Sequence, residues 1–169
     1  RESVIDLSSW LDKPAGKHGW LKAEKGKLVF EDGTPVVFWG SNITTYKVYK
    51  PTEMESPRRL AIYGINAVRF HKFTWRDSGV VVSNGKSTVL DPEKMDGMDR
   101  YFYKLKEQGI YVTWSHIFGH QVSKEDNLDS GFVGTGLFYD MDNSYAIINF
   151  AEDMQDLVIE LTKNLLEHK

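Results

Sequence analysis

Apolar and polar residues alternate along the first third of the chain, and this period of two predicts short β-strands. Residues 20–24 and 27–30 flank a Lys-Gly turn, and an Asp-Gly pair at 32–33 precedes an apolar run at 35–40. An Asp-Gly pair between such runs indicates a hairpin, because glycine adopts positive φ without strain. The pattern therefore predicts a β-meander that leads into a first main strand at 35–40.

Three later segments are predicted to be helices, the first from its boundary residues and the other two from apolar residues that recur every three to four positions. The first ends at Tyr63, with Gly64 as its C-terminal cap. It begins either at Thr52, in a capping box, or at Ser56, which places Pro57 at the first helical position.

The second helix is predicted to follow an Asp91 cap and to end at Gly109, and the third to cover 144–168. Further strands at 65–70 and 110–115 alternate with these helices, which predicts a parallel sheet. The loops after the strands are long and the turns before them are tight, a layout typical of a barrel. The apolar stripes expected to be buried are Met95, Met98, Phe102 and Leu105 in the second helix and Met154, Leu157, Val158, Leu161 and Leu165 in the third.

Composition narrows the classes of partner. Charged residues make up 27% of the 169 residues and the net charge is −3, so no basic surface indicates nucleic acid. No apolar run approaches the roughly 20 residues that cross a bilayer, and the absence of cysteine excludes disulfides and thiolate metal sites. Aromatic residues reach 13%, with five Trp; they fill cores, but flat indole faces also stack on sugars.

The strand predicted at 65–70 ends in two polar side chains. Residues on a strand alternate between faces, so Arg69 and His71 are expected on one face, about 7 Å apart. Chemistry in α/β enzymes lies at such carboxyl ends. The alternative is structural, with Arg69 paired to a surface carboxylate and His71 capping the strand.

Other polar residues are weighed as metal ligands or as acid/base groups. His116 and His120 stand four apart, but no third zinc ligand is evident. Asp77, Asp129 and Asp140 fit solvated loop positions better than acid/base roles. The oxygen-bearing residues weighed for calcium do not match an EF-hand spacing, so no metal or cofactor is predicted; they are Asp126, Asn127, Asp129, Asp140, Asp142 and Asn143.

Three stretches in order, 27–42, 64–71 and 109–116, resemble the first strands of clan A glycoside hydrolases, especially those similar to glycoside hydrolase family 5, which includes cellulases and mannanases. The resemblance implies an α/β (β/α)8 TIM barrel that hydrolyses β-linked poly- or oligosaccharides with retention. Residues 1–169 would then be the N-terminal portion of one catalytic domain. Its parts would be a lead-in at 1–19, the β-meander at 20–34 and three βα units at 35–169.

The resemblance also implies roles for individual residues. Arg69 matches the arginine that hydrogen-bonds the nucleophilic carboxylate, and His116 matches a histidine that contacts the sugar in the cleaved subsite. Both are supporting residues rather than catalysts. The expected substrate-binding residues are His71, Trp39, Asn42, Trp75, Tyr46 and Trp114, with Trp75 preferred as a stacking platform and barrel filling left open for Trp114.

Retaining hydrolysis needs two carboxylates roughly 5 Å apart. In the family they are glutamates on the fourth and seventh strands, which are expected beyond Lys169. This chain alone is therefore expected to lack catalytic residues and to be inactive. Its strand at 110–115 would form an open edge that pairs with the rest of the barrel or with a second copy.

Two other functions stay open: a carbohydrate-binding barrel relative without catalysis, and a metal-dependent barrel hydrolase that uses His71, His116 and His120. The expected partner is a carbohydrate, with no nucleic acid and no membrane. Residue 1 is Arg, so a processed start is expected. A secreted or periplasmic location follows from the substrate class.

Overall fold

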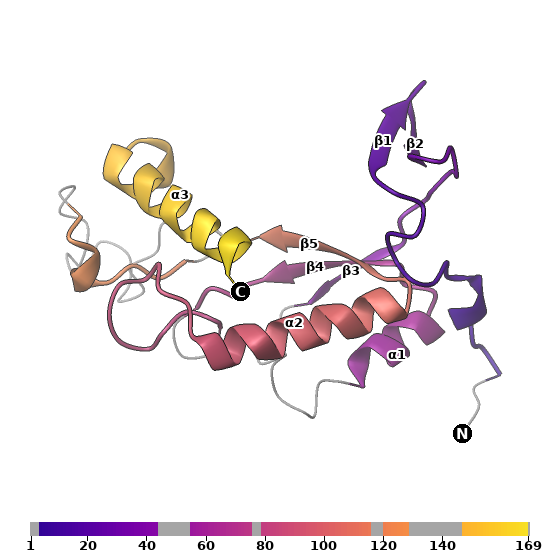
Figure 1. Cartoon of the computed structure of the whole chain (residues 1–169), viewed down its shortest axis with the longest axis horizontal. Helices are drawn as coiled ribbons and strands as arrows, with labels where there is room; N and C mark the ends of the chain where they lie inside the picture. The colour runs from indigo at the N-terminus through magenta and orange to yellow at the C-terminus, as the bar shows by residue number, and fades with distance from the viewer. Residues whose placement is uncertain (1–3, 44–54, 76–78, 116–119, 129–146, 169) are drawn as a thin grey trace.

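The computed structural model describes residues 4–43, 55–75, 79–115, 120–128 and 147–168 (Figure 1). They form a small mixed α/β structure with two sheets and three α-helices. The elements in chain order are η1 (Ser8–Trp10), β1 (Leu21–Glu24), β2 (Lys27–Phe30), β3 (Gly40–Ile43), α1 (Ser56–Ile62), β4 (Ala67–His71), α2 (Pro92–Glu107), β5 (Tyr111–Ser115), η3 (Lys124–Asp126), η4 (Ile147–Asn149) and α3 (Glu152–Glu167).

The first turn of the predicted β-meander is confirmed as a hairpin, whereas across the Asp-Gly turn at 32–33 the described residues form only an isolated antiparallel bridge between Val29 and Pro35. β1 and β2 pair antiparallel, and both residues of the turn between them, Lys25 and Gly26, have positive φ. Two positive φ values give the turn a twist that matches the twist of the flanking strands. The hairpin projects from the main body in Figure 1, and Phe30 anchors it by stacking on Tyr111 of β5.

The first main strand was predicted at 35–40, and this boundary is wrong because β3 begins only at Gly40. The side chain of Asn66 explains the shift. Its Nδ2 donates to the carbonyl of Val37 at 2.8 Å, and its Oδ1 accepts from the amide of Trp39 at 2.6 Å. A side chain thus takes the backbone hydrogen bonds that a neighbouring strand would otherwise make.

The parallel pairing predicted from strand and helix alternation is confirmed. β3, β4 and β5 lie side by side in that order and point the same way (Figure 1). An α-helix comes after each of these three strands in the chain. Val68 and Phe70 of β4 point toward the helices and are fully buried.

The predicted (β/α)8 barrel is wrong for this structure. A barrel needs a closed ring of strands. The described residues instead form an open three-stranded parallel sheet and a separate two-stranded antiparallel sheet. Within this part of the chain β3 and β5 are therefore edge strands.

The starts of α1 and α2 test the predicted N-terminal caps. α1 begins at Ser56, which favours the later of its two predicted starts, but Glu55 occupies the N-cap position without a side-chain hydrogen bond and Pro57 is the second helical residue rather than the first. Asp91 caps α2 as predicted, because its carboxylate accepts from the amides of Glu93 and Lys94.

The buried stripe of α2 differs from the prediction at one position. Met95, Met98 and Leu105 are buried as expected, but Tyr101 is fully buried where Phe102 was expected. Tyr101 can be buried because its hydroxyl has a hydrogen-bond partner, Ser56 Oγ at 2.5 Å.

α3 spans a shorter segment than the predicted helix, since Ile147–Asn149 forms a separate 3-10 turn. Met154, Leu157, Leu161 and Leu165 are buried as predicted, and Val158 is half-buried beside them. Among the described helices, none is both long and apolar enough to cross a lipid bilayer.

Candidate functional site

The candidate site lies on the face of the parallel sheet that points away from α1 and α2. Parallel register places Asn42, Arg69 and Thr113 side by side on β3, β4 and β5. All three are exposed. They line an open recess of about 250 Å³, together with Gly40, Ser41, Ala67 and Val68.

Arg69 is held by β5. Its Nε donates to Ser115 Oγ at 2.7 Å, which fixes the plane of the guanidinium. In the described part of the chain its terminal nitrogens have no partner and no carboxylate lies within ion-pair distance. The alternative for Arg69, an ion pair with a surface carboxylate, is thus not found among the described residues. The guanidinium has N–H donors available for a ligand.

His71 ends β4 and is buried, although it was expected to share the open face with Arg69. Burial lowers the pKa of His71 below its usual 6.5, and the nearby charges of Arg69 and Lys72 lower it further. The imidazole is therefore neutral at pH 7 and can donate from one ring nitrogen and accept at the other.

We expect His71 to reduce stability as the pH falls below about 6.5. Its pKa is lower in the fold than in the unfolded chain, so in that range the unfolded state binds more protons. Urea unfolding at pH 7.5 and 5.5 should show a smaller pH-dependent loss for His71→Gln than for the parent chain.

His168 opposes this trend, and it is present in both the parent chain and the His71→Gln variant. Burial lowers the pKa of His168, but its hydrogen bonds with Asp99 and the Leu165 carbonyl outweigh burial and raise it. Its contribution therefore cancels between parent and variant. An equal pH-dependent loss in both would contradict the assignment to His71.

The predicted stacking residues do not lie together. Trp114 tilts against Phe73 and Phe102 on the helix side of β5, away from the recess. Trp75 is half-buried, with the Lys72 ammonium 4.6 Å from its ring centre. Trp39 is 69% exposed just before β3, at the amino end of the sheet. Tyr46 and His116 lie outside the described residues.

The described residues give little support for a metal site. His120 is buried with Nε2 2.9 Å from Ser87 Oγ, and Asp126 accepts from the amides of Ser87 and Ser123. No group of three or more metal-binding side chains occurs in the part of the chain that is described. The positions outside it are His116, Asp77, Asp129, Asp140, Asp142 and Asn143.

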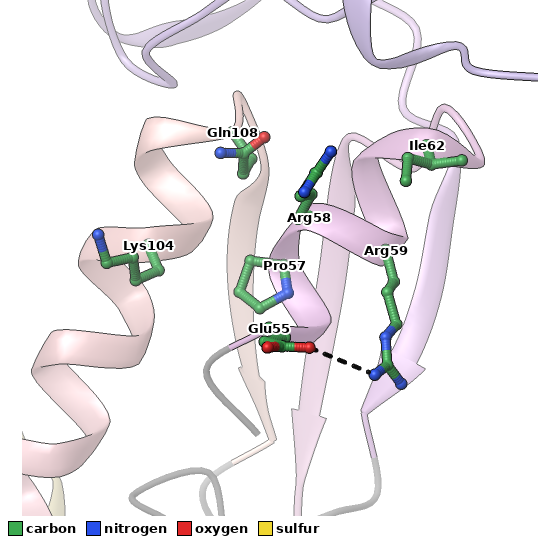
Figure 2. A pocket seen from close by; sticks show the side chains of 7 residues that line it. All are labelled: Glu55, Pro57, Arg58, Arg59, Ile62, Lys104 and Gln108. Atoms are coloured by element: carbon green, nitrogen blue, oxygen red, sulfur yellow. Dashed lines mark ion pairs between the residues drawn. The ribbon is translucent and has the colours of Figure 1, made fainter. Parts of the chain in front are cut away.

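A larger groove of about 490 Å³ lies between α1 and α2 (Figure 2). Two of its cations have local partners: Arg59 pairs with Glu55, which precedes α1, at 3.5 Å, and Lys104 pairs with Glu107 of α2 at 2.9 Å. Cations near a helix C-terminus also offset its negative dipole end. Arg59 and Lys104 are thus accounted for without a ligand, and of the lining cations Arg58 has no ion pair among the described residues; the sheet recess is the better candidate because three strands align hydrogen-bonding side chains along it.

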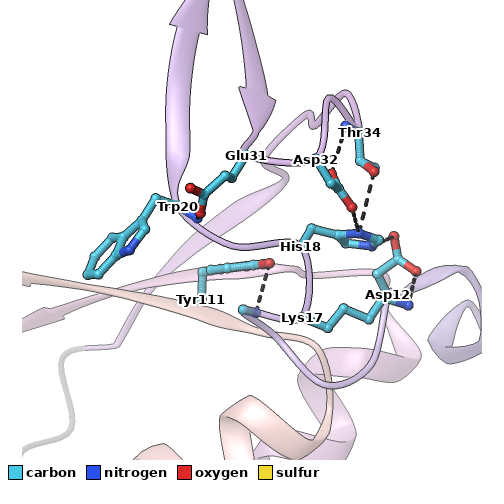
Figure 3. Close-up of polar contacts among 9 residues, drawn as sticks. Asp12, Lys17, His18, Trp20, Glu31, Asp32, Thr34 and Tyr111 are labelled. Carbon is cyan, nitrogen blue, oxygen red and sulfur yellow. Dashed lines mark hydrogen bonds and ion pairs between the residues drawn. The ribbon is translucent and has the colours of Figure 1, made fainter.

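No local sequence pattern predicts the polar cluster around His18 (Figure 3). Its Nδ1 lies 2.6 Å from Asp32 Oδ2, and its Nε2 lies 3.3 Å from Asp12 Oδ2. The backbone amide of Thr34, the imidazole of His18 and the Thr34 hydroxyl together lower the pKa of Asp32 to about 2. The cluster ties the lead-in loop to the turn that follows β2, a structural role.

Ser115 and Thr113 were also missed as site residues. They become neighbours of Arg69 only through the pairing of β4 with β5, which no local pattern specifies. Comparison with protein-family models, curated proteins and solved structures finds no match to this chain.

Proposed function

We propose that this chain forms a substrate-binding wall of a retaining glycoside hydrolase that acts on β-linked poly- or oligosaccharides. The observation that carries the proposal is the exposed row of Asn42, Arg69 and Thr113 beside the recess. Sugar hydroxyls both donate and accept hydrogen bonds. An amide, a guanidinium and a hydroxyl in one row supply both kinds of partner.

Arg69 has a second role in this proposal. Retaining hydrolysis uses a nucleophilic carboxylate and an acid/base carboxylate roughly 5 Å apart. A guanidinium with free N–H donors holds a carboxylate ionised and oriented. The residues that line the recess include no Asp or Glu, so the proposal assigns both carboxylates to residues that do not line it.

That same observation supports a second candidate, a carbohydrate-binding protein without catalysis. A recess with hydrogen-bonding groups and no carboxylate in its lining is sufficient for binding sugar. The two candidates share the binding step and differ in whether glycosidic bonds are cleaved.

We expect Arg69→Met to weaken the binding of β-linked oligosaccharides at least about tenfold. A hydrogen bond to a charged group contributes about 1.5–3 kcal/mol, and 1.4 kcal/mol is a factor of ten. Methionine keeps much of the side-chain length, and the position is exposed, so the fold should persist. Calorimetric titration with β-1,4-linked gluco-, manno- and xylo-oligosaccharides measures the effect.

Arg100→Met is the matched control, because Arg100 is an exposed arginine of α2 that pairs with Asp96. It should bind like the parent chain, and an α-linked glucan should bind to neither. Equal binding by Arg69→Met and the parent, or no binding of any β-linked glycan, would contradict the proposal. Reducing-sugar release by the chain would favour hydrolysis over binding alone.

A further inference from the structure

In the described part of the chain, β5 is an edge strand whose sequence lacks the usual protection of an edge. It pairs with β4 on one side, and no described strand pairs with its other side. Proteins protect exposed edges with charged residues, proline or bulges. The sequence of β5, Tyr-Val-Thr-Trp-Ser, contains no charge and no proline, and its β-branched and aromatic residues favour strand pairing.

The direction of the backbone groups on β5 follows from one hydrogen bond. The amide of Tyr111 donates to the carbonyl of Asn66 at 2.9 Å, toward β4. Alternate residues of a strand direct their N–H and C=O groups to the same side. The backbone N–H and C=O groups of Thr113 and Ser115 therefore also point toward β4. Those of Val112 and Trp114 point away from β4, toward the open edge.

We propose that β5 pairs antiparallel with β5 of a second copy of this chain, about a two-fold axis at Thr113. This register places Val112 opposite Trp114 of the second copy. The two-fold axis places Trp114 of the first copy opposite Val112 of the second in the same way. Both residues carry outward backbone groups, so each pair exchanges two hydrogen bonds. The edge is self-complementary, which favours a second copy over an unrelated strand.

The side chains suit the same register. Thr113 lies opposite Thr113 of the second copy, with Cβ atoms about 4.5–5.5 Å apart. Thr–Thr pairs and aromatic–β-branched pairs such as Trp114 with Val112 are favourable across strands. β3, the other edge, is a poorer candidate because it has four residues and begins with Gly40.

Sedimentation equilibrium of the 169-residue chain across micromolar concentrations tests the proposal. We expect the mass to rise from 19.4 kDa to twice that value. Thr113→Lys and Thr113→Glu should each weaken association at least about tenfold, because like charges would face each other across the axis. An equimolar mixture of the two variants should restore the dimer.

Thr113 is exposed, so both variants should keep the fold, which circular dichroism checks. Asn42→Lys is the matched control, since it adds the same charge to an exposed position of the β3 edge strand. It should dimerise like the parent chain. A parent that stays monomeric, Thr113 variants that associate normally, or a mixture that stays monomeric would overturn the proposal.

Discussion

Replacing Phe70 by alanine is expected to lower the free energy of unfolding by about 3–5 kcal/mol. Phe70 is fully buried behind the candidate site, with its ring edge-on to Tyr101 at 5.8 Å and to Phe102 at 5.0 Å between centroids. Alanine would remove these contacts and leave a cavity between the sheet and α2. Such a loss is a large part of the 5–15 kcal/mol of a typical domain, and urea unfolding measures it.

Phe150→Ala is the matched control because the same side chain is removed from a position that is 87% exposed. It should change the free energy of unfolding by no more than about 0.5 kcal/mol. Similar losses for the two variants would contradict the packing of β4 against α2.

Local signals in the sequence were sufficient for the helices and the hairpin. Asp91 and Pro92 specify the start of α2 through one carboxylate and one fixed φ, and both lie within three residues of the bonds they affect. The Lys25-Gly26 turn likewise specifies the hairpin through its own backbone angles. Each signal acts over a single turn, so no knowledge of the rest of the fold is required.

Long-range contacts were not predictable in the same way. The start of β3 depends on Asn66, which lies 27 residues beyond Trp39 in sequence and takes the hydrogen bonds of that backbone. The predicted barrel extended a correct local rule, alternation of strands and helices, to a closed ring. Alternation predicts parallel pairing, but it does not specify how many strands pair.

The candidate site shows the same division. Period-two alternation places Arg69 on the face opposite Phe70, and the structure exposes one and buries the other. Alternation also distinguishes the two faces of β5, but it does not exclude Trp114 from substrate binding. Its neighbours Phe73 and Phe102 come from separate segments and make it part of the core. Aromatic residues near a strand end are thus assigned reliably only once the packing is known.

Gly109 has one function that the sequence revealed and one that it did not. As predicted, it follows the end of α2, with φ +80° and its amide bonded to the Lys106 carbonyl. In addition, a Cβ at this position would lie 2.5 Å from the carbonyl oxygen of Asp12. The lead-in loop passes directly over this glycine, and its Ala15 amide also bonds Lys106.

We expect Gly109→Ala to destabilise the protein by about 3 kcal/mol or more, because a left-handed φ costs an L-residue about 1–2 kcal/mol and the collision with backbone adds to it. Gly26→Ala isolates the first cost, since Gly26 has φ +76° and no atom within 4 Å of its Cβ position. Urea unfolding should show the larger loss for Gly109→Ala. Equal losses would mean that the lead-in loop moves away to make room for a Cβ at position 109. The close approach of Asp12 would then contribute nothing to the attachment of this loop beside β5.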